Sequence, residues 1–187
     1  MQDILYIHGF LSSPQSAKAQ QMQAWALQHG GLRLMLPALP TDPGAALSLL
    51  EHCIAQSPTP PGLIGSSLGG FYANILAARH GLRAVLLNPA VHPHQLLSAY
   101  VGEQRNYHTG VASEVKPEHF RLLESLERAP AHPERLWVLL ETGDETLDYR
   151  QAAAFYAACT VDVSVGGAHT YEGFADRLPA IVKFLSQ

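Results

Sequence analysis

GLIGSSLGGFYA, residues 62–73, joins an apolar run to a helical pattern and decides which fold the chain can adopt. Its centre, GSSLG, matches the motif G-x-S-x-G, and Ser67 is the serine that has a glycine two residues before it and another two residues after it. The motif is typical of a nucleophile on a sharp turn between a strand and a helix, because small flanking residues let the chain turn without clashes. The alternative is that these small residues only pack a strand–helix junction.

Short apolar runs alternate with longer helical patterns along the rest of the chain. Most of these runs are nearly continuous in apolar residues, which is typical of strands covered on both faces. We expect strands at residues 3–7, 32–37, 62–66, 83–88, 135–141 and 160–165, and helices at residues 15–29, 43–56, 68–80, 117–128, 148–158 and 173–185. The predicted fold class is therefore α/β, with a mostly parallel, doubly wound sheet of about six strands.

The alternation breaks at about residues 92–134, a segment rich in histidine, proline and charged residues. A connection of this length inside a compact domain is typical of a lid or of a disordered stretch, and we expect a short lid-like insertion there. A chain of 187 residues fits one domain, so residues 1–187 are predicted to form a single unit.

The composition is 47% hydrophobic and 15% charged, with a formal net charge of −4, which is typical of an ordinary soluble protein and disfavours nucleic-acid binding. No apolar run approaches the roughly 18 residues of a membrane span, and the first ten residues do not resemble a signal peptide. Cys53 and Cys159 lie outside any C-x-x-C pairing, which fits a reducing compartment. We expect a cytoplasmic protein, and the sequence does not fix its oligomeric state.

A serine nucleophile needs a base and an acid, and both follow Ser67 in the order Ser, acid, His. Asp144 comes just after the apolar run LWVLLE, and His169 comes just after the last predicted strand. Both positions are loops at the carboxyl ends of strands, where parallel-sheet proteins place their sites. We predict that His169 takes the serine proton and that Asp144 orients the imidazole. Glu145 and Asp148 are the alternatives to Asp144, and a solvated loop histidine is the alternative for His169.

The sequence H-G-F-L after the first predicted strand supplies a fourth component. Hydrolases carry an H-G turn at this place, and the residue after it donates a backbone N–H to an oxyanion hole. Phe10 is therefore the predicted donor, together with the N–H of Leu68 next to the nucleophile. His8 is interpreted as a residue that shapes this loop.

This chain resembles the small YqiA-type esterases of the α/β-hydrolase superfamily in YIHGFLSSPQSAKA, GSSLGGFYA, LNPAVHP, ETGDETLDYRQA and GGAHTYEGF. The resemblance runs from the first predicted strand to the last helix. It implies a single-domain α/β-hydrolase fold and a compact bacterial cytosolic enzyme that cleaves carboxylic esters, with acyl thioesters as a second substrate class. It also implies a catalytic triad of Ser67, Asp144 and His169.

The residues around the motifs predict a largely apolar substrate pocket. Leu11, Tyr72, Pro89 and Tyr171 are the predicted substrate-binding residues, although core packing is an equally good interpretation for Tyr72. Leu11 stands where relatives often carry a polar residue, which weakens the transfer of a substrate from the family.

We expect no cofactor and no metal, because the lone H-x-H of residues 92–94 lacks a third ligand and GSSLGG lacks the ending of a Walker A loop. The predicted partner is a small ester or thioester substrate. Two alternative functions stay open: a triad hydrolase that acts on carbon–carbon or peptide bonds, and a binding protein that keeps the fold without turnover.

Overall fold

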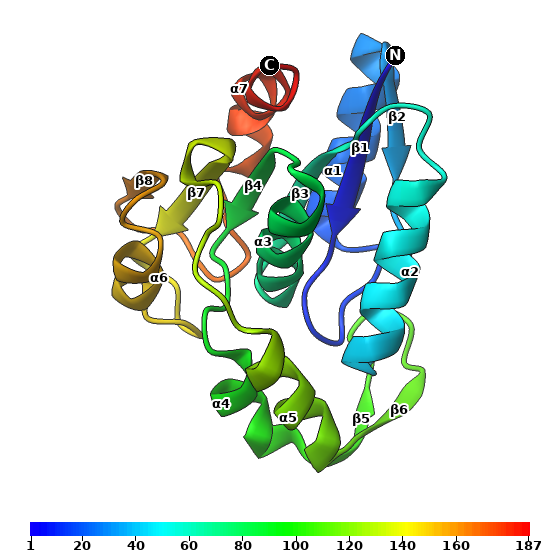
Figure 1. The fold of residues 1–187 in the computed structure, drawn as a ribbon, viewed down its shortest axis with the longest axis vertical. Coiled ribbons are helices and arrows are strands. Elements are labelled where there is room, and N and C mark those ends of the chain that lie inside the picture. The colour runs from blue at the N-terminus through cyan, green and yellow to red at the C-terminus, as the bar shows by residue number, and fades with distance from the viewer.

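The computed structural model describes residues 1–187 and contains a six-stranded sheet in which every pair of neighbouring strands is parallel (Figure 1). The order across the sheet is β2-β1-β3-β4-β7-β8. The strands are β1 (Gln2–Ile7), β2 (Leu32–Met35), β3 (Gly62–Ser66), β4 (Ala84–Leu87), β7 (Leu136–Glu141) and β8 (Thr160–Ser164). The predicted parallel α/β fold of about six strands is confirmed, and each strand overlaps its predicted range.

Helices cover both faces of the sheet and bury its side chains in two apolar clusters. Leu5 and Ile7 of β1 belong to the cluster that includes residues of four helices, α2 (Pro43–Ala55), α3 (Leu68–His80), α5 (Pro117–Leu126) and α6 (Tyr149–Phe155). Ile4 and Tyr6 point to the other face and join the cluster formed with α1 (Ala17–His29) and α7 (Phe174–Leu185). Because both faces are covered, successive residues of a strand must be apolar, which explains the continuous apolar runs.

Residues 92–134, which we call the cap segment, begin with helices and a hairpin that lie beyond one end of the sheet, opposite the two chain termini, and their last part returns along the sheet to the start of β7 at the other end (Figure 1). The segment contains α4 (Pro93–Leu97), the 3₁₀ turn η1 (Ser98–Tyr100), an antiparallel hairpin of β5 (Gly102–Arg105) and β6 (Ala112–Val115), α5 (Pro117–Leu126) and the 3₁₀ turn η2 (Pro133–Arg135). The predicted helix at residues 117–128 is confirmed as α5. The hairpin was not predicted, because GEQR and ASEV carry almost none of the apolar alternation that marks a half-buried strand.

The chain order reverses between β1 and β3, since β2 lies on one side of β1 and all later strands lie on the other. The loops that leave neighbouring parallel strands at such a reversal diverge and leave a crevice at the carboxyl ends of the strands. Both the turn at Ser67 and the loop that begins at His8 start at this point. No helix of the structure has both the length and the apolar character that crossing a bilayer requires.

Three glycines let the first turn of α3 lie directly against β1 and β3. A methyl group on Gly69 would lie 2.0 Å from the carbonyl oxygen of Ile7, and one on Gly65 would lie 2.3 Å from the carbonyl oxygen of Gly69. Gly9 faces the same turn, with the Cβ of Ser67 only 3.3 Å from the place of an added methyl group. These contacts fix the position of Ser67 relative to the loop after β1.

We expect Gly69→Ala to lower the free energy of unfolding by about 1–3 kcal/mol or more, because backbone atoms that cannot move aside occupy the space of the new methyl group. Gly173→Ala is the matched control: Gly173 has a φ of −72°, and its added methyl group would come no closer than 3.4 Å to its neighbours. That control should change stability by less than about 1 kcal/mol. Urea unfolding of the three proteins measures both values, and equal stabilities would contradict the packing argument.

Candidate active site

Ser67 lies on the turn between β3 and α3 in a backbone conformation that L-residues rarely adopt, with φ 55° and ψ −120°. Its N–H donates to the carbonyl of Leu87 at 3.0 Å, which ties the turn to the end of β4. Ser66 is buried, with 6% of its surface exposed, whereas the hydroxyl of Ser67 faces the loop that follows β8. The two adjacent serines therefore differ in their surroundings, and the hydroxyl of Ser67 is the one that contacts His169.

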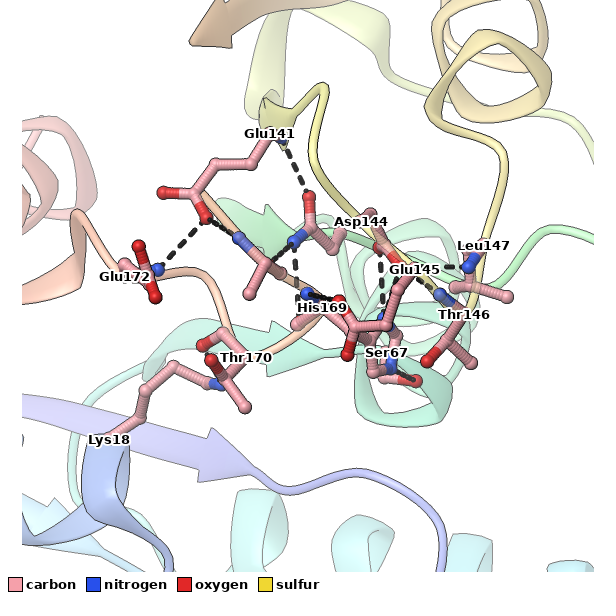
Figure 2. Close-up of polar contacts among 12 residues, drawn as sticks. Lys18, Ser67, Glu141, Asp144, Glu145, Thr146, Leu147, His169, Thr170 and Glu172 are labelled. Carbon is pink, nitrogen blue, oxygen red and sulfur yellow. Dashed lines mark hydrogen bonds and ion pairs between the residues drawn. The ribbon is translucent and has the colours of Figure 1, made fainter. Parts of the chain in front are cut away.

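Ser67, His169 and Asp144 form one hydrogen-bonded chain, although they come from three different loops (Figure 2). His169 Nε2 lies 3.0 Å from Ser67 Oγ. His169 Nδ1 lies 3.0 Å and 2.9 Å from the two carboxylate oxygens of Asp144. The Asp144 side chain is 2% exposed and the His169 side chain is 21% exposed, so the acid is shielded while the imidazole reaches the surface of the site.

Asp144 is held in its charged form. Burial by itself would raise the pKa of Asp144, but the hydrogen bond with His169 and those from the N–H groups of Leu147 and Thr146 outweigh it and lower the pKa below its ordinary value. The ionised carboxylate therefore stabilises the fold above the ordinary pKa of an aspartate, and this contribution is lost as the pH falls through the lowered value.

The two other acids considered for this role have different partners. Glu145 is exposed, and its carboxylate accepts the backbone N–H of His169 at 2.9 Å without contacting the ring. Asp148 caps the N-terminus of α6, where it accepts the N–H of Arg150 at 3.0 Å. Asp144 is thus the carboxylate that contacts the imidazole.

The loop after β1 supplies a free backbone donor next to Ser67. The N–H of Phe10 makes no hydrogen bond within the protein, and that of Leu68 is at the first position of α3, where no carbonyl of the helix is available to it. His8 is buried, accepts the N–H of Leu39 at 3.1 Å through Nε2, and contacts the carbonyl of Gly9 through Nδ1. Burial lowers the pKa of His8, so a neutral ring holds this loop in place.

A second network, which the sequence did not reveal, fixes the loop that carries His169 (Figure 2). The buried carboxylate of Glu141, at the end of β7, accepts the N–H groups of Ala168 and Glu172 at 2.9 Å each and of Gly173 at 3.0 Å. Three N–H donors on one carboxylate leave almost none of its charge unsatisfied. The loop therefore closes around a single anionic side chain.

Asn88, which follows β4 with a φ of 40°, completes this network. Its amide donates to the carbonyls of Ala168 at 3.0 Å and His169 at 3.3 Å, and its oxygen accepts the N–H of Glu141 at 2.9 Å. Glu141 thus accepts hydrogen bonds from backbone N–H groups of the His169 loop, and Asn88 donates hydrogen bonds to backbone carbonyls of the same loop. A signal was present in the sequence, because both are polar residues at the ends of apolar strands, but no motif marks them.

The candidate site opens into a cavity of about 950 Å³. The cavity is lined by residues of the loop after β1, the start of α1, the turn at Ser67, the cap segment and the loop of His169; among them are Gly9, Phe10, Ser67, Leu68, Leu97, Tyr100, Leu147, His169 and Tyr171. Of the four predicted substrate-binding residues, only Tyr171 belongs to this lining. The side chains of Leu11 and Tyr72 are buried and line a separate pocket of about 30 Å³. Pro89 packs against Gly70, in the first turn of α3.

The structure contains no group of three or more histidine, cysteine, aspartate or glutamate side chains that could hold a metal ion. His92 and His94 of the H-x-H sequence lie near one carboxylate, that of Glu127, at 2.8 Å and 3.3 Å. These contacts join the start of α4 to the end of α5 within the cap segment.

Comparison with known proteins identifies the family. The uncharacterised protein family UPF0227 matches residues 3–186. The chain belongs to this family. One member, UPF0227 protein Shewana3_2292 from Shewanella sp. (strain ANA-3), is 26% identical over 136 residues, which are 72% of this chain and 69% of the relative. The predicted YqiA-type resemblance is confirmed.

Solved structures share the whole architecture. Est1E from Butyrivibrio proteoclasticus, solved with bound ferulic acid, superposes with a TM-score of 0.74 at 16% identity, over 100% of this chain and 88% of Est1E. The esterase domain of a Rhodothermus marinus protein gives a TM-score of 0.68 at 20% identity, over 99% of this chain and 85% of the domain. At these identities the likeness shows the fold, and the predicted α/β-hydrolase fold is confirmed.

Glu141→Gln tests the network around the His169 loop in this UPF0227 member. The substitution replaces one carboxylate oxygen by an NH₂ group, which places a donor opposite a backbone N–H, and we expect the free energy of unfolding to fall by about 1–3 kcal/mol. Glu145→Gln, which alters an exposed carboxylate with a single loop contact, should have a smaller effect. Urea unfolding at neutral pH measures the free energy of unfolding of both variants. An equal loss in the two variants would show that the hydrogen bonds to Glu141 do not stabilise the fold more than the single contact of Glu145.

Proposed function

We propose that this protein is a serine hydrolase that cleaves carboxylic esters through an acyl-enzyme intermediate. The observation that carries the proposal is the hydrogen-bonded chain from Ser67 through His169 to Asp144, which opens into a large cavity beside free backbone N–H groups. A serine hydroxyl is a weak nucleophile at neutral pH, and this arrangement supplies the base that activates it.

The first half of the reaction forms the acyl-enzyme. With Asp144 ionised, Nδ1 of His169 carries the proton of their hydrogen bond and Nε2 is free to accept a proton from Ser67 Oγ. The oxygen attacks the ester carbonyl carbon, and the N–H groups of Phe10 and Leu68 stabilise the oxyanion that develops. Collapse of this intermediate breaks the bond to the alcohol, whose oxygen takes the proton from Nε2.

The second half returns the enzyme to its starting state. A water molecule enters where the alcohol left, and Nε2 of His169 takes one of its protons as the oxygen attacks the acyl carbon. The second tetrahedral intermediate expels Ser67 Oγ, which recovers its proton from Nε2. The products are the carboxylic acid and the alcohol, and no cofactor takes part.

Esters are favoured over the other bond types by the cavity. The residues of α4 and η1 that line it, Pro93, Leu96, Leu97 and Tyr100, are apolar or aromatic and suit an acyl chain. Acyl thioesters are the second substrate class, since the same steps cleave them. Activity against acyl chains of graded length, offered as both esters and thioesters, would define the size of the pocket and separate the two classes.

Ser67→Ala should reduce hydrolysis of short p-nitrophenyl esters at least about a thousandfold while the protein stays folded, because the nucleophile is removed. Ser66→Ala removes the neighbouring hydroxyl from the same turn and should keep most of the activity. Circular dichroism verifies folding of both variants. Hydrolysis by Ser67→Ala at the wild-type rate would show that the nucleophile is assigned incorrectly.

Asp144→Asn should lower kcat by about four orders of magnitude, because an amide cannot hold His169 in the tautomer that leaves Nε2 unprotonated. Asp148→Asn is the matched control: asparagine caps a helix as well as aspartate does, so kcat should stay within about twofold of the wild type. Steady-state kinetics on one ester measures both variants. A similar loss in both would indicate that neither acid acts through His169.

A binding protein without turnover is the rival from another class, and a fluorophosphonate probe separates it from an enzyme. Such probes react with an activated serine, so the proposal requires stoichiometric labelling of Ser67 that His169→Ala prevents. If the probe does not label the wild-type protein and the wild type hydrolyses no ester, the protein is a binding protein and the proposal is wrong.

A further inference from the structure

The cavity at Ser67 has two chemically different ends. Toward the cap segment it is lined by Pro93, Leu96, Leu97 and Tyr100 and, from the turn of the hairpin, by Tyr107 and His108; the ring of Tyr100 packs edge-on against Phe10 with 5.5 Å between centroids. At the other end, polar side chains from α1 and from the loop of His169 line it; they are Ser16, Lys18, Gln21, Thr170 and Glu172. A substrate that fills this cavity therefore meets a mostly apolar surface of α4 and η1 on one side and a polar surface of α1 and the His169 loop on the other.

Lys18 is the only lysine or arginine side chain in the cavity lining. Its ammonium group donates to the carbonyl of Thr170, the residue after His169, and forms no ion pair with any carboxylate (Figure 2). An ammonium has three donors, so two stay available. An unpaired, partly buried charge of this kind gains most from an anionic partner.

The start of α1 adds to the positive potential at this end. Ser16, the residue before the helix, makes no side-chain cap, and the first turn contains no acidic residue. The free N–H groups of this turn therefore keep the partial positive charge of a helix N-terminus. Gln21 lies three residues after Lys18, on the same face of the helix, and offers a further amide donor to the cavity.

The proposed mechanism indicates which half of the substrate lies at the polar end of the cavity, beside Lys18: the alcohol half. In the proposed mechanism His169 Nε2 protonates the leaving oxygen, so the alcohol lies on the side of the His169 loop. Lys18 contacts that loop at Thr170. The acyl half then extends toward the cap segment, where Leu96, Leu97 and Tyr100 provide apolar contacts.

We propose, on the basis of the proposed esterase function, that Lys18 binds an anionic group on the alcohol half of the substrate. The substrate class is therefore esters of an apolar acid with a carboxylate-bearing alcohol or phenol. Lys18 is a specificity-determining residue in this view, and the hydrolytic steps at Ser67 do not require its charge.

The experiment compares two butanoate esters that differ at one group, a carboxylate in the first and its neutral methyl ester in the second: the butanoate esters of 4-hydroxybenzoate and of methyl 4-hydroxybenzoate, with release of butanoate measured for both. In Lys18→Met we expect kcat/KM for the anionic ester to fall at least about tenfold relative to the neutral ester, which corresponds to about 1.4 kcal/mol. Lys116→Met is the control, since Lys116 is an exposed lysine of the cap segment outside the cavity lining. It should leave the ratio unchanged.

A second pair of esters tests which half carries the charge. The 4-nitrophenyl monoester of glutaric acid has its carboxylate on the acyl side, and 4-nitrophenyl butanoate is its neutral partner. Lys18→Met should alter the ratio for this pair less than threefold. A loss confined to this pair would overturn the assignment to the alcohol half.

The pH dependence of the first ratio gives an independent check. Burial lowers the pKa of Lys18 to about 8, against the opposing charge of Glu141. The other titratable groups that line the cavity are Glu172, His108, His169, Tyr100, Tyr107 and Tyr171. Because the ammonium loses its charge as the pH rises through about 8, preference for the anionic ester should fall over that interval in the wild type and stay flat in Lys18→Met.

A measurement of ligand binding tests the role of Lys18 independently of whether the protein is an esterase. In Ser67→Ala no turnover is needed, so calorimetry can compare the affinities of the two hydroxybenzoate esters with Lys18 present and with Lys18→Met added. Tighter binding of the anionic ester that disappears with Lys18 supports the site even if the wild type hydrolyses nothing. The proposal is overturned if both esters bind equally, or if Lys18→Met weakens both to the same extent, which would indicate a role only in holding the Thr170 carbonyl.

Discussion

The contact between the first turn of α3 and the end of β1 is the constraint on which the site depends. Gly65 and Gly69 leave no room for a methyl group, so the helix sits directly on the strand backbone. That proximity holds Ser67 in its strained conformation and presses Gly9 against it. Ser67 and Phe10, whose N–H is free, therefore line the same cavity, although they are 57 positions apart in the chain. Strain of this kind persists only when surrounding contacts determine it fully.

A second constraint acts on the loop that brings His169 to Ser67. This loop has no regular structure, and its backbone groups find their partners in Glu141 and Asn88, which leave two neighbouring strands at the same edge of the sheet. A buried carboxylate with three N–H donors is rigid, because any movement of the loop would leave a charge unsatisfied. The position of His169 is thus fixed by side chains of the sheet and not by the loop itself, as the proposed proton transfer from Ser67 would require.

The sequence predicted the sheet and its helices well, because continuous apolar runs between helical patterns fit few other folds. It also predicted which side chains the structure brings together, since G-x-S-x-G, the acid and the histidine each follow a strand. It did not predict the β5–β6 hairpin, whose residues are held by contacts to the loop after β1, such as Asn106 to the carbonyl of Ser12 at 2.7 Å. Glu141, Asn88 and Lys18 were missed for the same reason: their roles depend on partners distant in sequence.

The predicted pocket residues show that closeness to a motif in the sequence does not predict which side chains line the cavity. Leu11 and Tyr72 are next to the motifs in the chain, yet both side chains are buried and line the small separate pocket, and Tyr72 packs in the core on the inner side of α3. Beyond the loops of Ser67, Phe10 and His169, the cavity lining comes from the cap segment and from the first turn of α1, which lie further along the chain from the catalytic motifs. The residues of the proposed reaction therefore lie at strand ends, in short patterns that can be recognised in the local sequence. The proposed substrate preference depends instead on surfaces that the fold places opposite these residues, here Lys18 on one side of the cavity and the apolar residues of α4 on the other.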